Sequence, residues 1–259
     1  MWPLYAALAG AVVGSALTAV IGRASRPRSL LTDRSRCPTC RHVLAPKDLI
    51  PVISFLRLRG QCRYCRRAIP RWYPVVELAT IVLFVSAATL LPSVPPGALV
   101  LLWALLACLF ALAIVDLQTM RLPDALVLTF AVAALFRSVV FGIPPLPEAV
   151  GGGLLGFALF GILHALSSVI PRWRGSTTMG FGDVKLAGAL GLALGVPGMI
   201  AGAFLAFGAG GVVGSGLLLM KRATWSSHVP FGPFLAGAGI LLLVLPALPA
   251  RLFSLMVFQ

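Results

Sequence analysis

Charged residues are scarce in this sequence of 259 residues. Only 11% of its residues are charged, whereas 59% are hydrophobic, and soluble domains carry about 25% charged residues. So few charges cannot cover the surface of a water-soluble core of this size, which excludes an ordinary soluble domain. Long uncharged runs are typical of membrane spans instead. We therefore predict an all-α polytopic membrane protein.

Acidic residues are scarcer still. Asp and Glu total seven against 21 Lys and Arg, which gives a net charge of +14. Thirteen of the basic residues lie between Arg23 and Arg71, as the positive-inside rule predicts for a cytoplasmic segment. No basic helix with interleaved aromatic residues, and no known nucleic-acid-binding module, accompanies the charge. We expect anionic membrane lipids as partners of this charge and no nucleic acid.

Eight apolar runs follow one another, separated by Pro, Gly and basic residues. They cover residues 2–22, 74–92, 98–115, 124–142, 149–170, 184–196, 197–220 and 231–250. The run 184–196 is short for a full span, so it is either a tilted helix or part of a helix shared with its successor. We expect about eight transmembrane helices, or six or seven if runs merge. The N-terminus should lie outside, because the basic residues follow the first run.

Four of the five cysteines form two pairs, Cys37 with Cys40 and Cys62 with Cys65. Each C-x2-C pair can present two thiolates from one tight turn, and two such pairs complete the tetrahedral coordination of zinc. Thiols in a cytoplasmic segment stay reduced, which favours metal ligands over disulfides. Four thiolates leave no open coordination position, so we predict structural zinc. The alternatives are reduced cysteines without metal and a redox pair, for which no thioredoxin-like unit is present.

Two of the seven acids lie where apolar runs meet the cytoplasmic face of this topology. Asp116 follows the run 98–115, and Asp183 begins another run after Gly180-Phe181-Gly182. Ionisable groups at such positions are costly and are therefore functional candidates. If brought together, two carboxylates share one proton, so that one activates water while the other polarises a peptide carbonyl. Gly180 and Gly182 would let the backbone approach an extended substrate closely.

Other roles for these acids give rival hypotheses. Asp183 follows two glycines at a helix start, where N-capping is chemically reasonable, whereas the helix dipole disfavours an anion at the helix C-terminus where Asp116 lies. A proton-coupled transporter with a structural zinc module would also use membrane acids. The transporter hypothesis predicts acids near the middle of the membrane and broken helices at corresponding positions in two halves of the chain. No internal repeat that would mark two such halves is visible in the sequence. A membrane scaffold leaves the paired aspartates without a role.

Several short motifs follow one another along nearly the whole chain. They are Gly14-Ser15, the two Cys pairs, Asp48-Leu49-Ile50-Pro51-Val52, Leu58-Arg59-Gly60, Arg71-Trp72-Tyr73-Pro74-Val75-Val76-Glu77-Leu78, Asp116, Leu122-Pro123-Asp124, Gly180-Phe181-Gly182-Asp183-Val184-Lys185-Leu186 and Pro230-Phe231-Gly232-Pro233. In this order and spacing they resemble the type IV prepilin peptidases, membrane aspartic peptidases that carry a G-x-G-D motif. The resemblance implies Asp116 and Asp183 as the catalytic pair.

The resemblance also implies what the protein acts on and where. The substrates would be type IV prepilin or pseudopilin precursors, cut after a Gly and before an apolar helix at the cytoplasmic face of the inner (plasma) membrane. Many members that contain the cysteines then methylate the new N-terminus with S-adenosylmethionine. A peptidase without methyltransferase activity is the alternative.

Three further residues take expected roles around the site. Asp124 is a site-shaping residue, although an Asp after Pro also suits a helix start. Lys185 either orients a carboxylate or extends to lipid headgroups, and we favour the headgroups. Glu77 either pairs with an Arg or contributes to a methyl-transfer site. These assignments divide the chain into a first transmembrane helix (1–22), a cytoplasmic four-cysteine zinc-binding domain (23–73) and a membrane peptidase domain (74–259).

Overall fold

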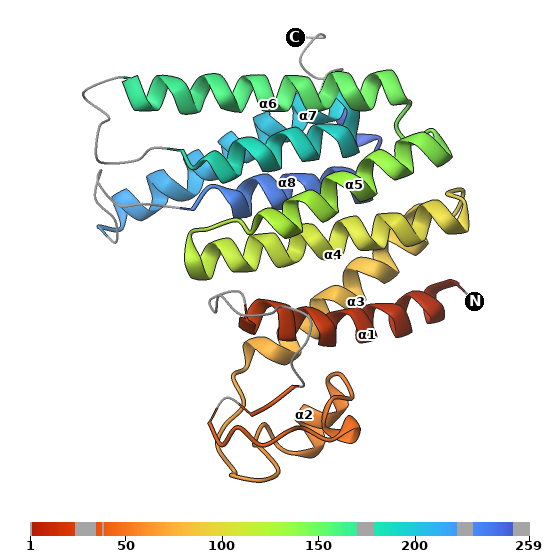
Figure 1. Ribbon diagram of the computed structural model, residues 1–259, viewed down its shortest axis with the longest axis vertical. Helices are drawn as coiled ribbons and strands as arrows, with labels where there is room; N and C mark the ends of the chain where they lie inside the picture. The colour runs from red at the N-terminus through yellow and green to blue at the C-terminus, as the bar shows by residue number, and fades with distance from the viewer. Residues whose placement is uncertain (1, 24–34, 38, 170–178, 222–229, 251–259) are drawn as a thin grey trace. The chain divides into compact units, whose positions relative to one another are not determined.

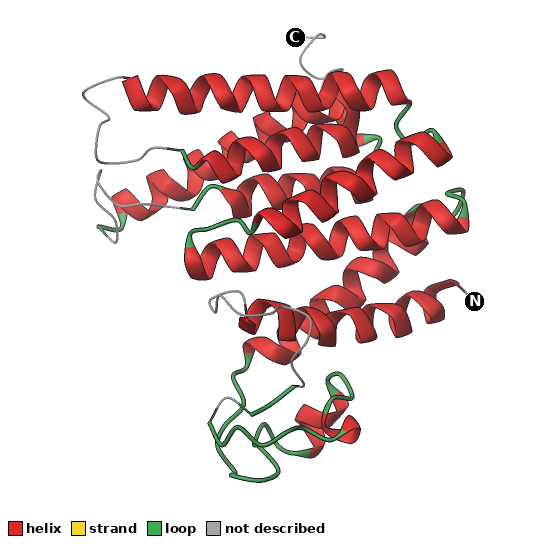
Figure 2. Cartoon of the chain, in the orientation of Figure 1, coloured by secondary structure: helices red, strands yellow, loops and turns green. Residues whose placement is uncertain are grey.

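The computed structural model describes residues 2–23, 35–37, 39–169, 179–221 and 230–250. The regular structure of these residues is helical, without strands (Figure 2). Two isolated antiparallel bridges pair Arg36 with Val43 and Gln61 with Ala68. Six of the described helices are long and apolar enough to cross a membrane. The prediction of an all-α polytopic membrane protein is confirmed.

The chain divides into two compact units, Met1–Ser93 and Val94–Gln259. Figure 1 labels the helices of both units. The first unit contains α1 (Trp2–Arg23), η1 (Pro46–Asp48), α2 (Ile53–Arg57) and α3 (Trp72–Leu90). The second contains α4 (Pro96–Thr119), α5 (Asp124–Phe141), α6 (Leu146–Val169), α7 (Phe181–Leu219) and α8 (Gly232–Val244).

In the first unit, α1 packs closely against α3 through glycines spaced four residues apart. A Cβ atom on Gly10 would lie 2.8 Å from Cα of Ile81, and one on Gly14 would lie 2.9 Å from Cα of Glu77. Small residues at this spacing let the backbones of membrane helices approach each other. The close contact places Glu77 of α3 directly against α1.

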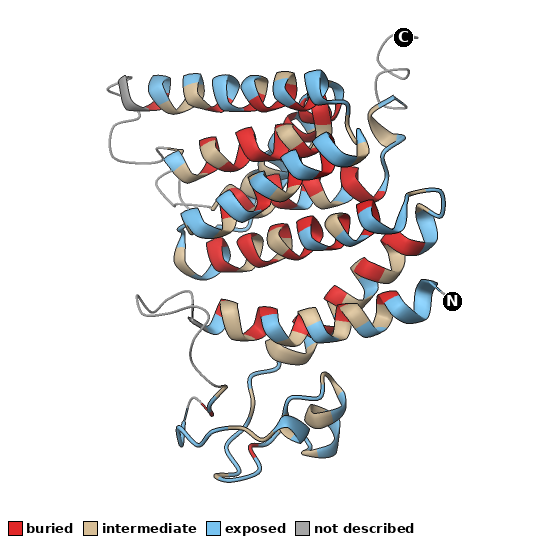
Figure 3. Ribbon diagram, turned by 45° about the vertical axis from the view of Figure 1, so that its right-hand side comes forward, coloured by how far each residue is buried: buried red, intermediate tan, exposed pale blue. Residues whose placement is uncertain are grey.

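In the second unit, α7 packs against α5, α6 and α8, while α4 packs against α5 and α8. Buried residues form stripes along these helices and alternate with exposed faces (Figure 3). Leu105, Leu109 and Leu190 are fully buried, whereas Leu128 and Leu154 are mostly exposed. Exposed apolar faces on helices of this length suit a lipid environment.

The predicted runs 184–196 and 197–220 both lie in α7, which spans 39 residues. A straight helix of this length would extend about 58 Å at about 1.5 Å per residue, roughly twice the hydrocarbon thickness of a bilayer. However, Gly195 has non-helical angles (φ 71°, ψ −178°), and Pro197 follows it. The merger that the sequence left open therefore occurs across a kink. Each of the eight predicted runs overlaps a described helix, two of the runs share α7, and α8 is shorter than a full span.

Candidate functional site

The Asp116 carboxylate lies buried near the end of α4, with 5% of the residue exposed. It accepts a hydrogen bond from the backbone N–H of Gly232, the first residue of α8. A helix N-terminus stabilises an anion, so α8 offsets the unfavourable dipole at the end of α4. A Cβ on Gly232 would lie only 2.5 Å from Oδ2 of Asp116. Glycine is therefore the residue that permits this contact.

Asp183 lies in the first turn of α7 and is also buried, at 8% exposed. Its carboxylate accepts a hydrogen bond from the backbone N–H of Gly180, the N-cap residue. An acid in the third helical position that reaches back to the N-cap is one half of a capping box. Asp183 thus does help to cap the helix. A carboxylate has about four acceptor sites, so capping leaves capacity for a substrate or water.

The two aspartates lie close enough for the charge of Asp116 to act on the Asp183 carboxylate. Helix α8 holds this arrangement, because it packs against both α4 and α7. A Cβ on Gly239 of α8 would lie 2.5 Å from Leu190 of α7 and 3.1 Å from Leu109 of α4. Both acids thus lie in the second unit, on α4 and α7, and their predicted catalytic pairing stays a prediction.

The loop before Asp183 is attached to α6. Nδ1 of His164 lies 2.6 Å from the carbonyl oxygen of Met179, and the His164 and Phe181 ring centroids are 5.8 Å apart. Gly182 lies against Leu122, to which a Cβ would approach within 3.2 Å. The apolar run around His164 gave no sign in the sequence that this residue would contact the loop before Asp183.

Gly232 is a second residue whose position was missed. Its motif, Pro230-Phe231-Gly232-Pro233, was visible in the sequence. A glycine between two prolines indicated a constrained backbone. However, no sequence pattern showed that its N–H would meet Asp116, more than a hundred residues earlier.

Asp124 and Lys185 form an ion pair of 2.8 Å between Oδ1 and Nζ. The side chain of Asp124 is 74% exposed and that of Lys185 is 36% exposed. The Lys185 ammonium also lies 5.2 Å from the centroid of the Phe181 ring. Lys185 therefore contacts Asp124 rather than either buried aspartate, and its predicted contact with lipid headgroups stays a prediction.

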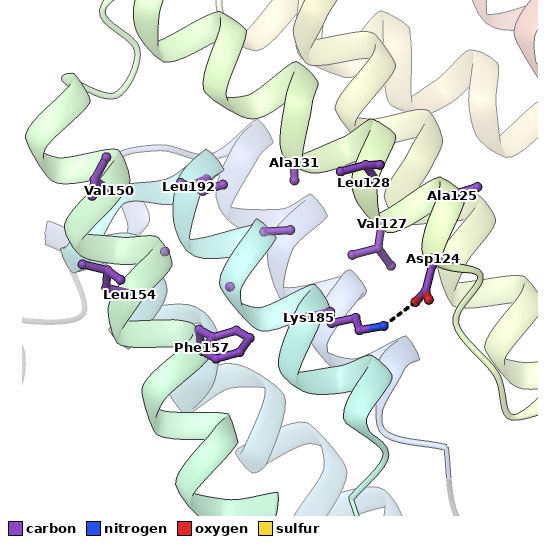
Figure 4. Close-up of a pocket in the computed structure, with 13 residues that line it drawn as sticks. Asp124, Ala125, Val127, Leu128, Ala131, Val150, Leu154, Phe157, Lys185 and Leu192 are labelled. Carbon is purple, nitrogen blue, oxygen red and sulfur yellow. Dashed lines mark hydrogen bonds and ion pairs between the residues drawn. The ribbon is translucent and has the colours of Figure 1, made fainter.

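An apolar groove of about 600 Å³ begins at this ion pair. Figure 4 shows its lining residues on α5, α6 and α7, with the Lys185–Asp124 contact at one end. Apolar side chains line the rest, among them Val127, Leu128, Leu154, Phe157 and Leu192. Neither Asp116 nor Asp183 lines the groove, so it is not itself a reaction centre.

Glu77 lies on α3 in the first unit, with 9% of the residue exposed. Its Oε2 accepts a hydrogen bond of 2.7 Å from the backbone N–H of Val52. Val52 has a φ of 59°, which is rare for a β-branched residue. In the described part of the chain the ion pairs are Arg63–Asp48 and Lys185–Asp124. The Arg pairing, one of the two roles expected for Glu77, is therefore absent there, and the carboxylate accepts from a loop amide.

The sulfur atoms of Cys37, Cys40, Cys62 and Cys65 lie within 4.8 Å of one another. Those of Cys37 and Cys65 are 3.9 Å apart, and a tetrahedral site with metal–sulfur bonds of about 2.3 Å separates its sulfurs by about 3.8 Å. Burial acts to raise the pKa of the Cys37 thiol, but hydrogen bonds with the backbone at Cys40 and Thr39 and with the thiols of Cys40 and Cys62 together lower the pKa to about 7. A hydrogen bond with the backbone at His42 acts to lower the pKa of Cys40, but desolvation and the neighbouring thiols raise it to about 11, so the cluster does not hold all its thiols alike. The thiolate is the form that binds metal. The four cysteines therefore fit a structural metal site.

The two Cys pairs adopt the same turn. The N–H of Arg41 donates to the carbonyl of Cys37, and the N–H of Arg66 donates to that of Cys62, both at 2.9 Å. The φ angles of the two arginines are also alike, at 57° and 54°. We call these turns the first knuckle (36–43) and the second knuckle (61–68). The two knuckles are a short structural repeat, although no internal repeat was visible in the sequence.

Comparisons with known proteins cover both units. A family model for the bacterial peptidase A24 N-terminal domain matches residues 8–91. A second, for the type IV leader peptidase family, matches residues 103–215. No solved structure matches the chain.

Curated relatives agree with these matches. A prepilin leader peptidase/N-methyltransferase of Aeromonas salmonicida is 38% identical over 216 residues, covering 82% of this chain and 71% of the relative. A protein of the same name from Burkholderia pseudomallei is 36% identical over 211 residues, covering 82% and 67%. An Escherichia coli type 4 prepilin-like proteins leader peptide-processing enzyme is 31% identical over 265 residues and covers 95% of both chains. With its two buried aspartates and cysteine cluster in the matched regions, the chain belongs to the type IV leader peptidase family.

Proposed function

We propose that this protein cleaves the leader from type IV prepilin or pseudopilin precursors and then methylates the new N-terminus with S-adenosylmethionine. The observation that carries the peptidase part is the pair of buried carboxylates, Asp116 and Asp183, within electrostatic reach of each other on different helices. The names of the relatives support both parts. Transport is not favoured, because both acids lie near helix ends rather than at mid-span.

In the proposed mechanism, the two carboxyl groups share one proton. The ionised carboxylate takes a proton from water as the water oxygen attacks the scissile carbonyl carbon. The protonated carboxyl group donates a hydrogen bond to the carbonyl oxygen, where negative charge develops. The tetrahedral intermediate then loses its amine, which takes up the proton held by the first carboxyl group.

Neighbouring residues are proposed to shape this site rather than to react. Gly180 and Gly182 begin the helix that contains Asp183, and Gly182 contacts Leu122 without space for a larger side chain. The Asp124–Lys185 pair connects the first residue of α5 to the second turn of α7. We assign these four residues to positioning the backbone near the substrate, and Glu77 to the methyl-transfer site.

The metal that the four cysteines hold is proposed to be zinc in a structural role. Zinc prefers four tetrahedral ligands, and a set of four thiolates leaves no position for a water to be activated. The metal would join the two knuckles across the gap between Cys40 and Cys62, and peptide hydrolysis would not involve it.

The proposed location is the inner (plasma) membrane, with the active site facing the cytoplasm. The concentration of basic residues between Arg23 and Arg71 supports this orientation through the positive-inside rule. In this assignment residues 1–22 are the first span, 23–73 the cytoplasmic zinc-binding domain and 74–259 the peptidase domain. Anionic lipids would contact the basic segment.

Incubation of the purified full-length protein with a prepilin in detergent tests the proposal. We expect cleavage by the parent and a loss of about 10²-fold or more in Asp116→Asn and in Asp183→Asn, the usual range for general acid–base groups. Asp124→Asn is the matched control, because it makes the same change in an exposed ion pair, and it should lose less than about tenfold. If cleavage by Asp116→Asn or by Asp183→Asn falls no further than the small loss expected of Asp124→Asn, the proposed catalytic roles are wrong.

A further inference from the structure

A pocket of about 550 Å³ lies in the first unit, between the α1–α3 helix pair and the two knuckles. Its volume is within the range of about 300–1,000 Å³ that is typical of small-molecule and cofactor sites. Ser15 and Thr18 of α1 and Tyr73 and Glu77 of α3 form its helical wall. The buried aspartates of the second unit do not line it, so it is separate from the proposed peptidase site.

The charged lining residues are Glu77 on the helical wall and, on the opposite side, three arginines and the ion pair of Asp48 with Arg63. Glu77 is buried on α3, and one of its oxygens accepts from Val52. The knuckles contribute Arg36, Arg41 and Arg67, all exposed to solvent. In the described part of the chain no carboxylate lies within ion-pair distance of these three arginines. The pocket thus suits a ligand with a cationic centre inside and an anionic group near the solvent.

Apolar and aromatic side chains complete the lining. Phe55 lies in α2 and Leu58 directly follows it, Ile69 follows the second knuckle, and Tyr73 is the second residue of α3. Flat aromatic side chains favour stacking of a planar ring. A nucleobase is a ligand group of this kind, and base–aromatic stacking is favourable whatever the base.

We propose that this pocket binds S-adenosylmethionine, with its cationic sulfonium centre near Glu77 and its carboxylate near the knuckle arginines. The adenine would occupy the part lined by Phe55 and Tyr73. This inference rests on the proposed methyltransferase function and adds to it a site and the residues that form it. A phosphate headgroup of an anionic lipid would also suit the arginines, but the buried acid disfavours a second anion beside it.

The position of Glu77 also fits the transfer itself. The lone pair of a neutral N-terminal amine attacks the methyl carbon, and the electron pair of the carbon–sulfur bond goes to sulfur, which leaves S-adenosylhomocysteine. The nitrogen then loses a proton, for which Glu77 is a nearby acceptor. Glu77 therefore serves both to attract the sulfonium and to take up this proton.

Binding measurements on the full-length protein in detergent test the site without relying on activity. The parent should bind S-adenosylmethionine about tenfold more tightly than S-adenosylhomocysteine, because only the former carries a positive charge on sulfur. A tenfold ratio is the size expected for one charge-assisted contact. Glu77→Gln retains an acceptor for the Val52 N–H but should lose the preference between the two ligands.

The equivalent positions of the two knuckles provide a matched pair of variants. Arg41 lines the pocket and Arg66 does not, although both follow the second cysteine of a pair with similar φ angles. Arg41→Gln should weaken binding of both ligands by about tenfold, whereas Arg66→Gln should change neither. Metal content and prepilin cleavage are measured on the same preparations to report the folding of both units.

Three results would overturn this inference. If the parent cleaves prepilin but does not bind S-adenosylmethionine, the proposed binding site is wrong and the proposed peptidase function stands. If Arg41→Gln and Arg66→Gln weaken ligand binding equally, the pocket is not the binding site. The same conclusion follows if phosphatidylglycerol vesicles bind through Arg41 and S-adenosylmethionine does not bind at all. By contrast, a parent that binds as described but does not cleave prepilin contradicts the proposed peptidase and leaves the pocket assigned.

Discussion

At the scale of single residues, the environment of Asp116 depends on a glycine that carries no functional group. Gly232 brings the N-terminus of α8 against the carboxylate and donates its backbone N–H. Burial of a carboxylate without such a partner costs several kcal/mol. Gly232 therefore helps to hold the Asp116 carboxylate in its buried position.

We predict that Gly232→Ala lowers prepilin cleavage by more than about tenfold, because its Cβ would overlap the carboxylate of Asp116 and misplacement of a reacting group by about 1 Å can cost 10²-fold. Gly237→Ala is the control, since it lies in the same helix with no atom within 4 Å of the added Cβ. That variant should cleave normally and unfold at a slightly higher temperature, as Ala in place of Gly favours a helix. Equal cleavage by both variants would contradict the role of Gly232.

The cysteine cluster gives a second prediction at this scale. Cys62→Ser should reduce bound zinc from about one per chain to near zero, because loss of one thiolate opens a four-ligand site. Cys108→Ser should keep the metal, since Cys108 lies in α4 and outside the cluster. Metal analysis of the purified proteins measures this. A folded parent that contains no zinc would exclude the structural metal.

Residue types were predictable from the sequence, but several partners were not. The two aspartates and four cysteines were identifiable because charge in apolar runs and C-x2-C spacing are local signals. The contacts of Glu77 with Val52 and of Asp116 with Gly232 join distant segments through backbone amides. A backbone amide is present at every residue except proline, so no pattern of residue types indicates which one will bind a carboxylate.

At the scale of helices, α6 and α7 meet along glycines. Gly152 of α6 contacts the backbone of Gly191, and Gly156 contacts the backbone of Ala187. Contact between backbones leaves no side chain that could move to accept a larger residue. The position of α7, and of Asp183 at its start, therefore depends on this seam.

We predict that Gly152→Leu lowers the unfolding temperature clearly and reduces prepilin cleavage, because the added side chain would force α6 away from α7. Overpacking of a filled interior typically costs about 1–3 kcal/mol. Gly211→Leu places the same side chain on α7 where an added Cβ meets nothing within 4 Å. Thermal unfolding in detergent compares the two. A Gly152→Leu variant as stable as Gly211→Leu would show that the seam is not tightly packed.

Helix existence was predictable from the apolar runs, but helix continuity was not. Runs 184–196 and 197–220 were separated by Pro197 in the sequence and are joined in α7. A proline inside a helix removes one hydrogen bond and bends the helix without always ending it. Here Gly195 adopts the angles that a kink requires. Whether the helix continues past Pro197 depends on the packing of α5, α6 and α8 around α7, which the sequence does not show.

At the scale of the whole molecule, the two family matches fall in different units. The N-terminal match, residues 8–91, corresponds to the unit with the cysteine cluster and the proposed S-adenosylmethionine pocket. The leader peptidase match, residues 103–215, lies in the unit with both buried aspartates. The two proposed chemistries should therefore be separable by point substitutions in one unit or the other.

A double-mutant comparison tests whether Asp116 and Asp183 act as one catalytic unit. Prepilin cleavage is measured for Asp116→Asn, Asp183→Asn and the variant with both changes. Groups that act as a unit are strongly non-additive, so removal of either costs about as much as removal of both. We predict that the double variant is no slower than the slower single variant. Losses that multiply in the double variant would show independent roles and contradict the account.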